Sequence, residues 1–157
     1  MAKRTDNKIK ALAIVGPTSP GKSDMAVWLA KKFGGEVVSA DSRQVYRGMN
    51  LGTGKVTKAE MSGVPHYLLD VVSPKKVFTV SDYKKMAMMA IEKISAKKRM
   101  PIVCGGTGLY VQSIVDDLDI PDVPPNLKLR KELAKKGAAE LYNTLKRLDP
   151  RRARNID

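Results

Sequence analysis

Eight consecutive residues near the N-terminus have the types and spacing of a phosphate-binding loop. The segment matches the pattern G-x-x-x-x-G-K-[ST] and stands between an apolar run and a helical pattern. Glycines let such a backbone curl so that its N–H groups point inward, and the following helix adds its positive N-terminal end. Lys22 supplies a mobile positive charge, and the Ser23 hydroxyl can ligate Mg²⁺. The pattern predicts a diphosphate or triphosphate site with Mg²⁺, formed by Gly16, Pro17, Thr18, Ser19, Pro20, Gly21, Lys22 and Ser23.

A carboxylate and a glycine-rich turn follow two later strand-like segments. Asp41 comes directly after the segment 36–40, and Gly105-Gly106-Thr107-Gly108 follows the segment 101–104. Because the carboxyl ends of parallel strands face the ligand crevice, both should lie near the phosphate-binding loop. Asp41 could accept a proton or hold a metal-bound water there, and the alternative is that it caps a turn. The glycines allow close approach of a ligand, and Thr107 offers a hydroxyl at a helix start.

The elements that must position these residues alternate between strands and helices over the first 116 residues. Apolar runs predict strands at 12–15, 36–40, 66–70 and 101–104, and apolar periodicity predicts helices at 22–33, 80–94 and 107–115. The segment Thr79-Val-Ser-Asp82 has the pattern of a capping box. Residues 41–65 form a long loop with one helical turn near 57–61. Strands separated by helices predict an α/β fold, a P-loop NTPase-like parallel sheet flanked by helices.

The character of the chain changes after Asp116. Pro121, Pro124 and Pro125 break the pattern, and a basic helical segment follows, with ten basic and three acidic residues between Leu127 and Arg154. We expect two parts, an α/β core over residues 1–120 and a basic helical segment over residues 121–157.

Composition limits the classes of protein to which the chain can belong. Of 157 residues, 29 are Lys or Arg and 16 are Asp or Glu, so the formal net charge is +13, which favours a polyanionic partner such as nucleic acid. The single cysteine, Cys104, excludes an intrachain disulfide and suits a reducing, cytoplasmic compartment. No apolar run is long enough to span a membrane.

In order along the chain, these and further motifs resemble the tRNA dimethylallyltransferases, also called isopentenyltransferases. The matching stretches are Gly16-Pro-Thr, Gly21-Lys-Ser23, Asp41-Ser42-x-Gln44-Val-Tyr-Arg-Gly48, Gly52-Thr53-x-Lys55, Pro65-His66-Tyr-Leu-Leu-Asp70, Phe78-x-x-x-x-Tyr83, Gly105-Gly-Thr-Gly-Leu-Tyr110 and Leu148-Asp-Pro150. They cover nearly the whole chain and correspond to the N-terminal half of the family. A nucleotide kinase would share the phosphate-binding loop and little else.

The resemblance implies transfer of a dimethylallyl group from dimethylallyl diphosphate to the N6 amine of an adenosine beside the tRNA anticodon. The phosphate-binding loop would hold the donor's diphosphate. Lys22 would neutralise the charge of the leaving group, and the Ser23 hydroxyl would bind Mg²⁺. Asp41 resembles the general base that takes the N6 proton, and Thr107 resembles the residue on the opposite wall. The resemblance implies tRNA contacts from Asp41, Ser42, Arg43, Gln44 and Thr107.

The basic helices after Pro125 resemble the start of the family's helical insertion, which grips the anticodon stem-loop. Pro20 stands where the family usually has Ser, and it lacks an N–H that could contact diphosphate. Asp157 precedes the family's C-terminal half, so the chain is either a fragment or a natural short form. We expect an exposed strand edge and apolar sheet surface, which lead to self-association or are covered by the basic helices.

Two other classes of function stay open at this point. The phosphate-binding loop alone would suit a P-loop nucleotide kinase or NTPase that binds ATP. An inactive RNA-binding remnant would keep the basic helices without a complete site. Within the transferase interpretation, the acceptor is either tRNA or a free adenine nucleotide.

Three single residues are predicted to be structural. His66 begins an apolar strand and is expected to make a hydrogen bond within the core. Trp28 lies between apolar neighbours in the first helix and is expected to pack, as is Cys104 in its strand. The methionines at 86, 88 and 89 are expected to fill gaps between helix and sheet.

Overall fold

The computed structural model describes residues 9–17, 21–120, 123 and 125–156. It divides the chain into two compact units, Met1–Pro121 and Asp122–Asp157. Three residues of the expected phosphate site, Thr18, Ser19 and Pro20, lie outside the described residues.

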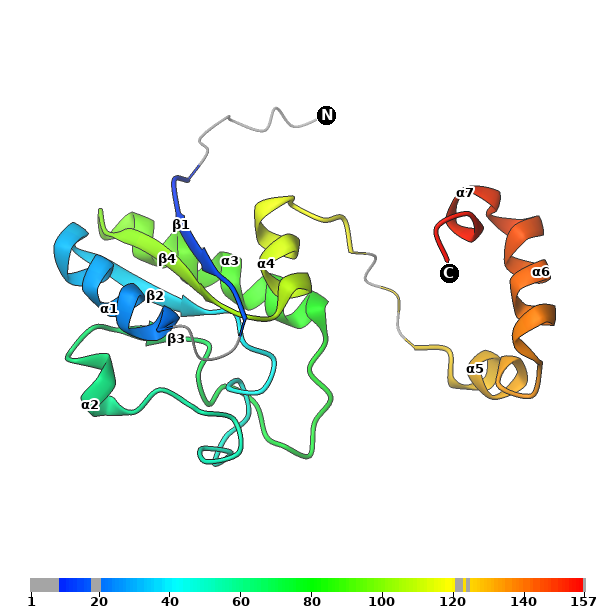
Figure 1. Ribbon diagram of the computed structural model, residues 1–157, viewed down its shortest axis with the longest axis horizontal. Coiled ribbons are helices and arrows are strands. Elements are labelled where there is room, and N and C mark those ends of the chain that lie inside the picture. The colour runs from blue at the N-terminus through cyan, green and yellow to red at the C-terminus, as the bar shows by residue number, and fades with distance from the viewer. Residues whose placement is uncertain (1–8, 18–20, 121–122, 124, 157) are drawn as a thin grey trace. The chain divides into compact units, whose positions relative to one another are not determined.

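Four parallel strands form the sheet of the first unit, in the order β1-β4-β2-β3 (Figure 1). The strands are β1 (Leu12–Val15), β2 (Gly35–Ser39), β3 (His66–Tyr67) and β4 (Met100–Gly105). The central strands β4 and β2 are buried along nearly their whole length, as expected for strands covered on both faces. The α/β class predicted from the sequence is thus confirmed.

The third strand is shorter than the predicted range of 66–70. Only His66 and Tyr67 pair with β2. Leu68 and Asp70 have positive φ angles of 63° and 55°, which a strand cannot contain. The chain therefore turns away from the sheet immediately after Tyr67.

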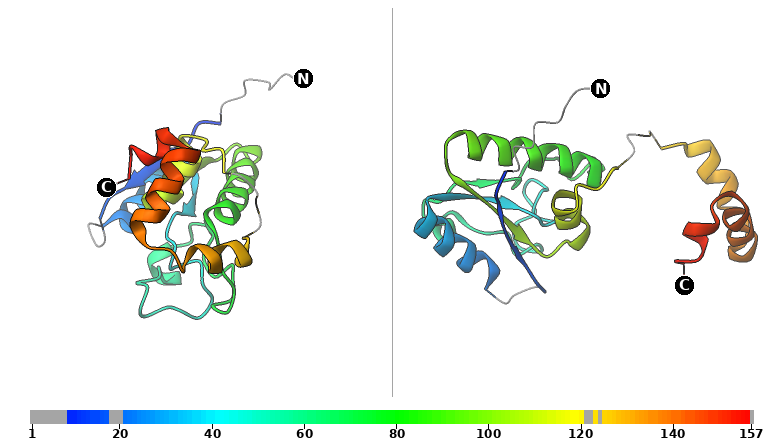
Figure 2. Two further views of the ribbon diagram at one scale, coloured as in Figure 1. Left: turned by 90° about the vertical axis from the view of Figure 1, so that its right-hand side faces the viewer. Right: turned by 90° about the horizontal axis from the view of Figure 1, so that it is seen from above.

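Helices cover both faces of the sheet (Figure 2). The helices of the first unit are α1 (Lys22–Phe33), α2 (Lys58–Met61), α3 (Val80–Ala96) and α4 (Gly108–Val115). Alternate strand residues point to opposite faces, so Val38 and Val103 pack with α3 and α4, whereas Val37 and Ile102 pack with α1. This arrangement places the carboxyl ends of β1, β2 and β4 at one edge of the sheet.

Capping residues define where α2 and α3 begin. The Thr79 side chain accepts a hydrogen bond from the Asp82 backbone, and the Asp82 carboxylate accepts one from the Thr79 N–H at 2.9 Å. This is the capping box that the sequence predicts. An equivalent pair, Thr57 and Glu60, begins α2. Each box satisfies backbone N–H groups that a first helical turn leaves without partners.

A buried carboxylate lies at the opposite end of β2 from Asp41. Glu36 is 1% exposed and accepts hydrogen bonds from the Tyr67 hydroxyl at 2.6 Å and from Lys97 Nζ at 3.0 Å. The Arg99 guanidinium lies 3.3 Å away. This Glu36 cluster joins β2, β3 and the segment between α3 and β4 through paired charges, which a buried carboxylate requires.

Trp28 does not pack as predicted. Its side chain is 57% exposed on the outer face of α1, and Lys32 Nζ lies 4.8 Å from the ring centroid. The buried positions of α1 are instead Ala26, Val27 and Ala30. Small residues at those positions let the helix lie close to the sheet, so the indole is left outside.

Of the three methionines on α3, two behave as predicted. Met86 and Met88 pack against the core, whereas Met89 is 68% exposed. Met89 precedes the buried Ala90 but projects from the solvent side of α3.

Among the described residues, no helix is both long and apolar enough to cross a membrane.

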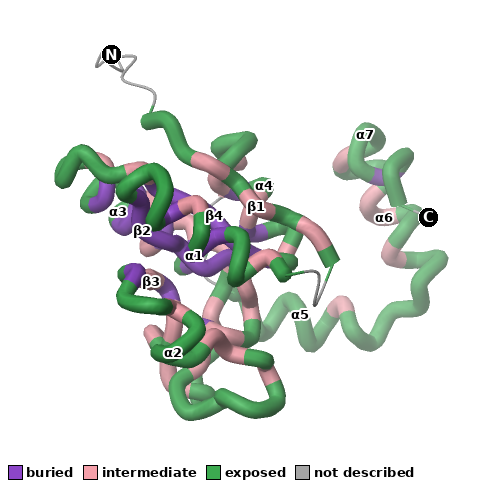
Figure 3. The backbone as a smooth tube through the Cα atoms, turned by 60° about the vertical axis from the view of Figure 1, so that its left-hand side comes forward, coloured by how far each residue is buried: buried purple, intermediate pink, exposed green. Residues whose placement is uncertain are grey.

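The second unit consists of α5 (Leu127–Leu133), α6 (Ala138–Leu148) and α7 (Pro150–Ala153). Asn126 caps α5 and Asp149 caps α7 through side-chain oxygens. Ala153 is its one buried residue among those described, and Figure 3 shows the rest as intermediate or exposed. By itself this unit therefore has almost no core.

Candidate functional site

The phosphate-binding loop lies between β1 and α1, as the sequence predicts. Gly21 is the N-cap of α1 and has a φ of 75°, a left-handed conformation that favours glycine. Lys22 Nζ donates a hydrogen bond to the Pro17 carbonyl, so the side chain folds back along the loop. Ser23 is exposed in the first turn of α1. The loop thus presents an ammonium and a hydroxyl beside the positive end of a helix.

Asp41 follows β2 and caps the turn after it. Its Oδ1 accepts hydrogen bonds from the backbone N–H groups of Arg43 at 2.8 Å and Gln44 at 3.3 Å. The alternative interpretation of Asp41 as a turn cap is therefore correct as far as Oδ1 is concerned. Oδ2 makes no hydrogen bond within the described part of the chain. One carboxylate oxygen thus orients the side chain while the other stays available.

Thr107 connects the loop after β4 to the loop after β2. It is the N-cap of α4, but its hydroxyl makes no capping bond. Thr107 Oγ1 instead accepts a hydrogen bond from the Ser42 N–H at 2.9 Å and donates to Ser42 Oγ at 3.2 Å. The Thr107 N–H donates to the Ala40 carbonyl. These bonds fix the positions of Asp41 and Thr107 relative to each other.

Close backbone contact explains the glycine at the end of β4. A Cβ atom on Gly105 would lie 2.2 Å from the Ala40 carbonyl oxygen, which no side chain could tolerate. Gly106 lies close to the Gly16 carbonyl, so the same turn also approaches the phosphate-binding loop. The sequence predicted that these glycines allow a ligand to approach. In the structure they allow the loops after β1, β2 and β4 to contact one another.

These loops surround a cleft of about 290 Å³. Of the predicted site residues, Gly21, Lys22, Ser23, Asp41 and Gln44 line it. Ser42, Arg43 and Thr107 do not, and Gly16 and Pro17 line a neighbouring cavity instead. Gly105 and Gly106, the glycines expected to allow a ligand to approach, line it too. Residues to which the sequence assigned no role in the site also line it: Asp24, Ala26, Val37, Ser39, Thr53, Gly54, Val56, Glu60, His66, Leu69 and Cys104.

His66 and Cys104 line the cleft as well as packing in the fold. His66 Nδ1 donates to the Val64 carbonyl at 2.9 Å, the structural hydrogen bond expected from the sequence. Desolvation lowers the pKa of His66 despite that bond, so the ring is neutral at pH 7. Burial raises the pKa of the Cys104 thiol to about 11, although nearby Lys22 acts in the opposite direction. Cys104 is therefore protonated and a poor nucleophile.

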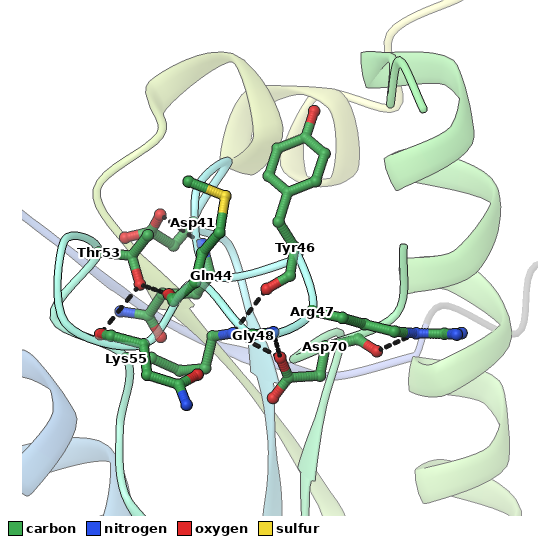
Figure 4. Close-up of polar contacts among 10 residues, drawn as sticks. Asp41, Gln44, Tyr46, Arg47, Gly48, Thr53, Lys55 and Asp70 are labelled. Carbon is green, nitrogen blue, oxygen red and sulfur yellow. Dashed lines mark hydrogen bonds and ion pairs between the residues drawn. The ribbon is translucent and has the colours of Figure 1, made fainter. Parts of the chain in front are cut away.

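A polar network holds the loop between Asp41 and Lys55 beside the cleft (Figure 4). The Lys55 side chain is only 5% exposed, and its Nζ donates to the Asp70 carboxylate and to the Tyr46 carbonyl at 2.6 Å. The Gly48 N–H also donates to Asp70, at 3.3 Å. Lys55 and Asp70 each end a motif that resembles the transferase family, but the distance between the two motifs in the sequence does not predict that the two side chains pair.

The cleft contains oxygen donors that suit Mg²⁺. The Ser23 hydroxyl and the Asp41 carboxylate line the same space, and Mg²⁺ is commonly bound by one or two protein oxygens together with substrate phosphates and waters. No cluster of three or more His, Cys, Asp or Glu side chains that could hold a metal occurs among the described residues. The arrangement places the N-terminus of α1, the Lys22 side chain, the Ser23 hydroxyl and the Asp41 carboxylate around one cleft.

Comparison with known proteins shows which family this chain resembles. The model of the IPP transferase family matches residues 44–157. The chain is 44% identical over 145 residues to a tRNA dimethylallyltransferase of Acaryochloris marina, covering 92% of this chain and 48% of that protein. It is 47% identical over 152 residues to one from Thermoanaerobacter sp. (strain X514), covering 94% and 48%. The chain spans about half the length of the curated relatives that it matches.

Solved structures agree with the sequence comparison. The full-length tRNA isopentenylpyrophosphate transferase from Bacillus halodurans is 42% identical with a TM-score of 0.72, over 96% of this chain and 51% of that one. A eukaryotic dimethylallyltransferase acting on tRNA is 31% identical with a TM-score of 0.82, over 96% and 38%.

Proposed function

Because this chain belongs to the IPP transferase family, we propose that it takes part in prenyl transfer to RNA. The donor is dimethylallyl diphosphate, and the acceptor is the N6 amine of an adenosine beside the tRNA anticodon. The observation that carries the proposal is the shared cleft, in which Gly21, Lys22 and Ser23 face the same space as Asp41. A phosphate site and a proton acceptor in one cleft suit a reaction that releases diphosphate and a proton together.

The phosphate-binding loop binds the donor. Backbone N–H groups and the N-terminus of α1 contact the diphosphate, and Lys22 leaves the Pro17 carbonyl to balance the leaving-group charge. The Ser23 hydroxyl would hold Mg²⁺ there. The ion would neutralise further negative charge as diphosphate departs.

Asp41 acts on the acceptor. A bond forms between N6 of the adenosine and C1 of the dimethylallyl group, while the bond from C1 to the diphosphate oxygen breaks and its electron pair leaves with diphosphate. The proton released from N6 passes to Asp41 Oδ2, since Oδ1 is held by the turn. The adenosine must leave the RNA stack to reach this cleft, where water cannot capture the allylic group.

The basic second unit supplies affinity for tRNA in this proposal. Its helices carry Lys and Arg side chains that are exposed, such as Lys128, Arg130 and Lys131 on α5. Contacts from such side chains to phosphates are insensitive to sequence and weaken steeply with salt. A cytoplasmic location, where tRNA is available, is part of the proposal.

Self-association through the sheet edge is also proposed. β1 pairs only with β4 among the described strands, so its other edge carries unpaired backbone groups. Val15 on this strand is 58% exposed. Exposed apolar strand edges favour pairing with another chain.

A ligand comparison tests the proposed function on the chain itself. A non-hydrolysable thiolo analogue of dimethylallyl diphosphate with Mg²⁺ should raise the melting temperature, and chelation of Mg²⁺ should reduce the shift. ATP with Mg²⁺ is the matched comparison. Stabilisation by ATP alone would favour a P-loop kinase or NTPase, and stabilisation by neither would leave an RNA-binding protein without donor chemistry.

A further inference from the structure

The loop between Tyr46 and Lys55, here called the Leu51 loop, exposes apolar side chains from a firmly held backbone. Leu51 is 100% exposed and Met49 is 44% exposed. Exposed aliphatic residues of this size are common when scattered over a surface. Here two lie within three residues at the tip of one loop, beside the cleft that Thr53 and Gly54 line.

The beginning of the Leu51 loop is anchored to the segment after β3. Tyr46 and Val72 form a parallel bridge, and the Arg47 N–H donates to the Val72 carbonyl at 2.9 Å. The Arg47 guanidinium donates to the carbonyls of Asp70 at 3.0 Å and Val71 at 3.2 Å. Arg47 is thus engaged in holding the loop.

The end and the interior of the loop are also fixed. Lys55 is bound to Asp70 and to the Tyr46 carbonyl, which closes the loop at its base (Figure 4). Inside, the Thr53 hydroxyl donates to the Met49 carbonyl, and the Lys55 N–H donates to the Asn50 carbonyl at 3.2 Å. The Gln44 amide donates to the Gly54 carbonyl at 3.2 Å. A loop restrained in this way loses little conformational entropy on binding.

The charges around the loop favour an anionic partner. Residues 41–80 contain six basic and three acidic side chains, a surplus of 6 − 3 = 3. Each of the three acidic side chains has a hydrogen-bond partner: Asp41 accepts at Oδ1 from its own turn, Glu60 caps α2 and Asp70 binds Lys55. The exposed basic residues of this region are Arg43, Arg47, Lys58, Lys75 and Lys76.

We propose that the Leu51 loop is an RNA wedge, in which Leu51 inserts against the base that neighbours the acceptor adenosine. Extruding one base from a loop leaves its neighbours unstacked, and apolar side chains such as Leu and Met stabilise such openings. The inference rests on the proposed function, because it requires an RNA acceptor at this cleft. A restrained apolar tip, in a segment whose basic residues outnumber its acidic ones by three, suits single-stranded RNA better than an apolar protein surface.

Fluorescence of a modified RNA tests the wedge directly. An anticodon stem-loop with 2-aminopurine beside the target adenosine should brighten when the whole 157-residue chain binds, because the probe unstacks. Leu51→Ala should abolish most of that increase and weaken binding about tenfold, as expected for loss of one buried aliphatic side chain. The slope of affinity against salt should not change, because no phosphate contact is removed. Met89→Ala, an exposed apolar truncation on α3, should behave as the wild type.

The outcomes separate the wedge from the proposed function. Donor-analogue binding is measured on the same variants and should be equal in wild type and Leu51→Ala. If Leu51→Ala binds RNA and brightens the probe as the wild type does, the wedge is wrong. The apolar tip would then suit a protein partner. If donor-analogue binding is absent while Leu51→Ala still loses the fluorescence change, the assignment of the prenyl donor is wrong, whereas the insertion of Leu51 into bound RNA stands.

Discussion

At the scale of single residues, the site is organised by side chains that bind backbone. Asp41 holds its own turn, and Thr107 holds the turn of Ser42. The sequence placed Asp41 and Thr107 at strand ends correctly, since that inference needed only the direction of parallel strands. The pairing of Thr107 with Ser42, 65 residues apart, depends on which strands are neighbours, and no local pattern contains that information.

Lys22→Ala should weaken binding of the dimethylallyl diphosphate analogue while leaving the fold intact. Among the described residues, the ammonium donates its hydrogen bond to a loop carbonyl, so its loss should cost little folding free energy. Without it the diphosphate charge is poorly balanced, and affinity should fall about 10- to 100-fold. Titration calorimetry measures the change, with the melting temperature of the free protein as control. An unchanged dissociation constant would contradict the assignment.

Asp41→Asn should slow prenyl transfer and spare donor binding. The Asn side-chain oxygen can still accept from the N–H groups of Arg43 and Gln44, so the turn survives. An amide cannot take the N6 proton, a role worth about 10²- to 10⁴-fold in rate. The rate is measured with an anticodon stem-loop at saturating donor. A variant that keeps the wild-type rate would leave Asp41 as a turn cap only.

At the scale of elements, the sequence predicts the structure correctly where interactions between residues close together in the chain determine it. The capping box of Thr79 and Asp82 begins α3 as predicted. The predicted length of β3 and the predicted burial of Trp28 were wrong, because each depends on packing against residues that are distant in the sequence. The left-handed residue Leu68 interrupts an apolar run, and the helix face that meets the sheet uses Ala26 and Ala30 instead of the largest side chain.

The contact between α3 and α4 contains a hydroxyl without a partner. Tyr83 stacks on Tyr110 with ring centroids 3.9 Å apart. Its hydroxyl is buried and makes no hydrogen bond to the described residues, and burial raises its pKa. Tyr83→Phe keeps the stack and removes the unpaired group, so the free energy of unfolding should stay equal or rise by about 1 kcal/mol. Urea denaturation tests this against Tyr83→Leu, which removes the stack. A loss of stability in Tyr83→Phe would indicate an ordered water on that hydroxyl.

The Glu36 cluster should make the junction of β2, β3 and α3 sensitive to acid. Burial acts to raise the pKa of Glu36, but the Tyr67 hydroxyl, Lys97 and Arg99 together hold it below its ordinary value. A lowered pKa contributes stability that is present above pH 4.5, the ordinary value, and is lost as pH falls through the folded-state pKa.

Glu36→Gln measures that contribution. Its unfolding free energy should be lower at pH 7 by about 1–3 kcal/mol, the scale of hydrogen bonds to a charged group. The difference from wild type should shrink below pH 4.5. Glu92→Gln serves as the control, since Glu92 is exposed on α3. A difference that stays constant with pH would show that the charge of Glu36 is not what stabilises the junction.

At the scale of the whole molecule, two tendencies oppose each other. In the proposed association, the exposed Val15 and the edge of β1 that pairs with no described strand favour contact between copies, whereas a net charge of +13 repels them. Light scattering should therefore show a mass that grows with protein concentration and grows further as salt screens the charge. A strict monomer at high salt would contradict association through this edge.

The exposed indole on α1 has a spectroscopic consequence. Trp28 is the only tryptophan of the chain, and more than half of its side chain already meets solvent in the folded protein. Its emission should be red-shifted before denaturation and should change little during it, so unfolding is better followed by circular dichroism. Because Lys32 lies over the ring, iodide should quench this emission more strongly than caesium does.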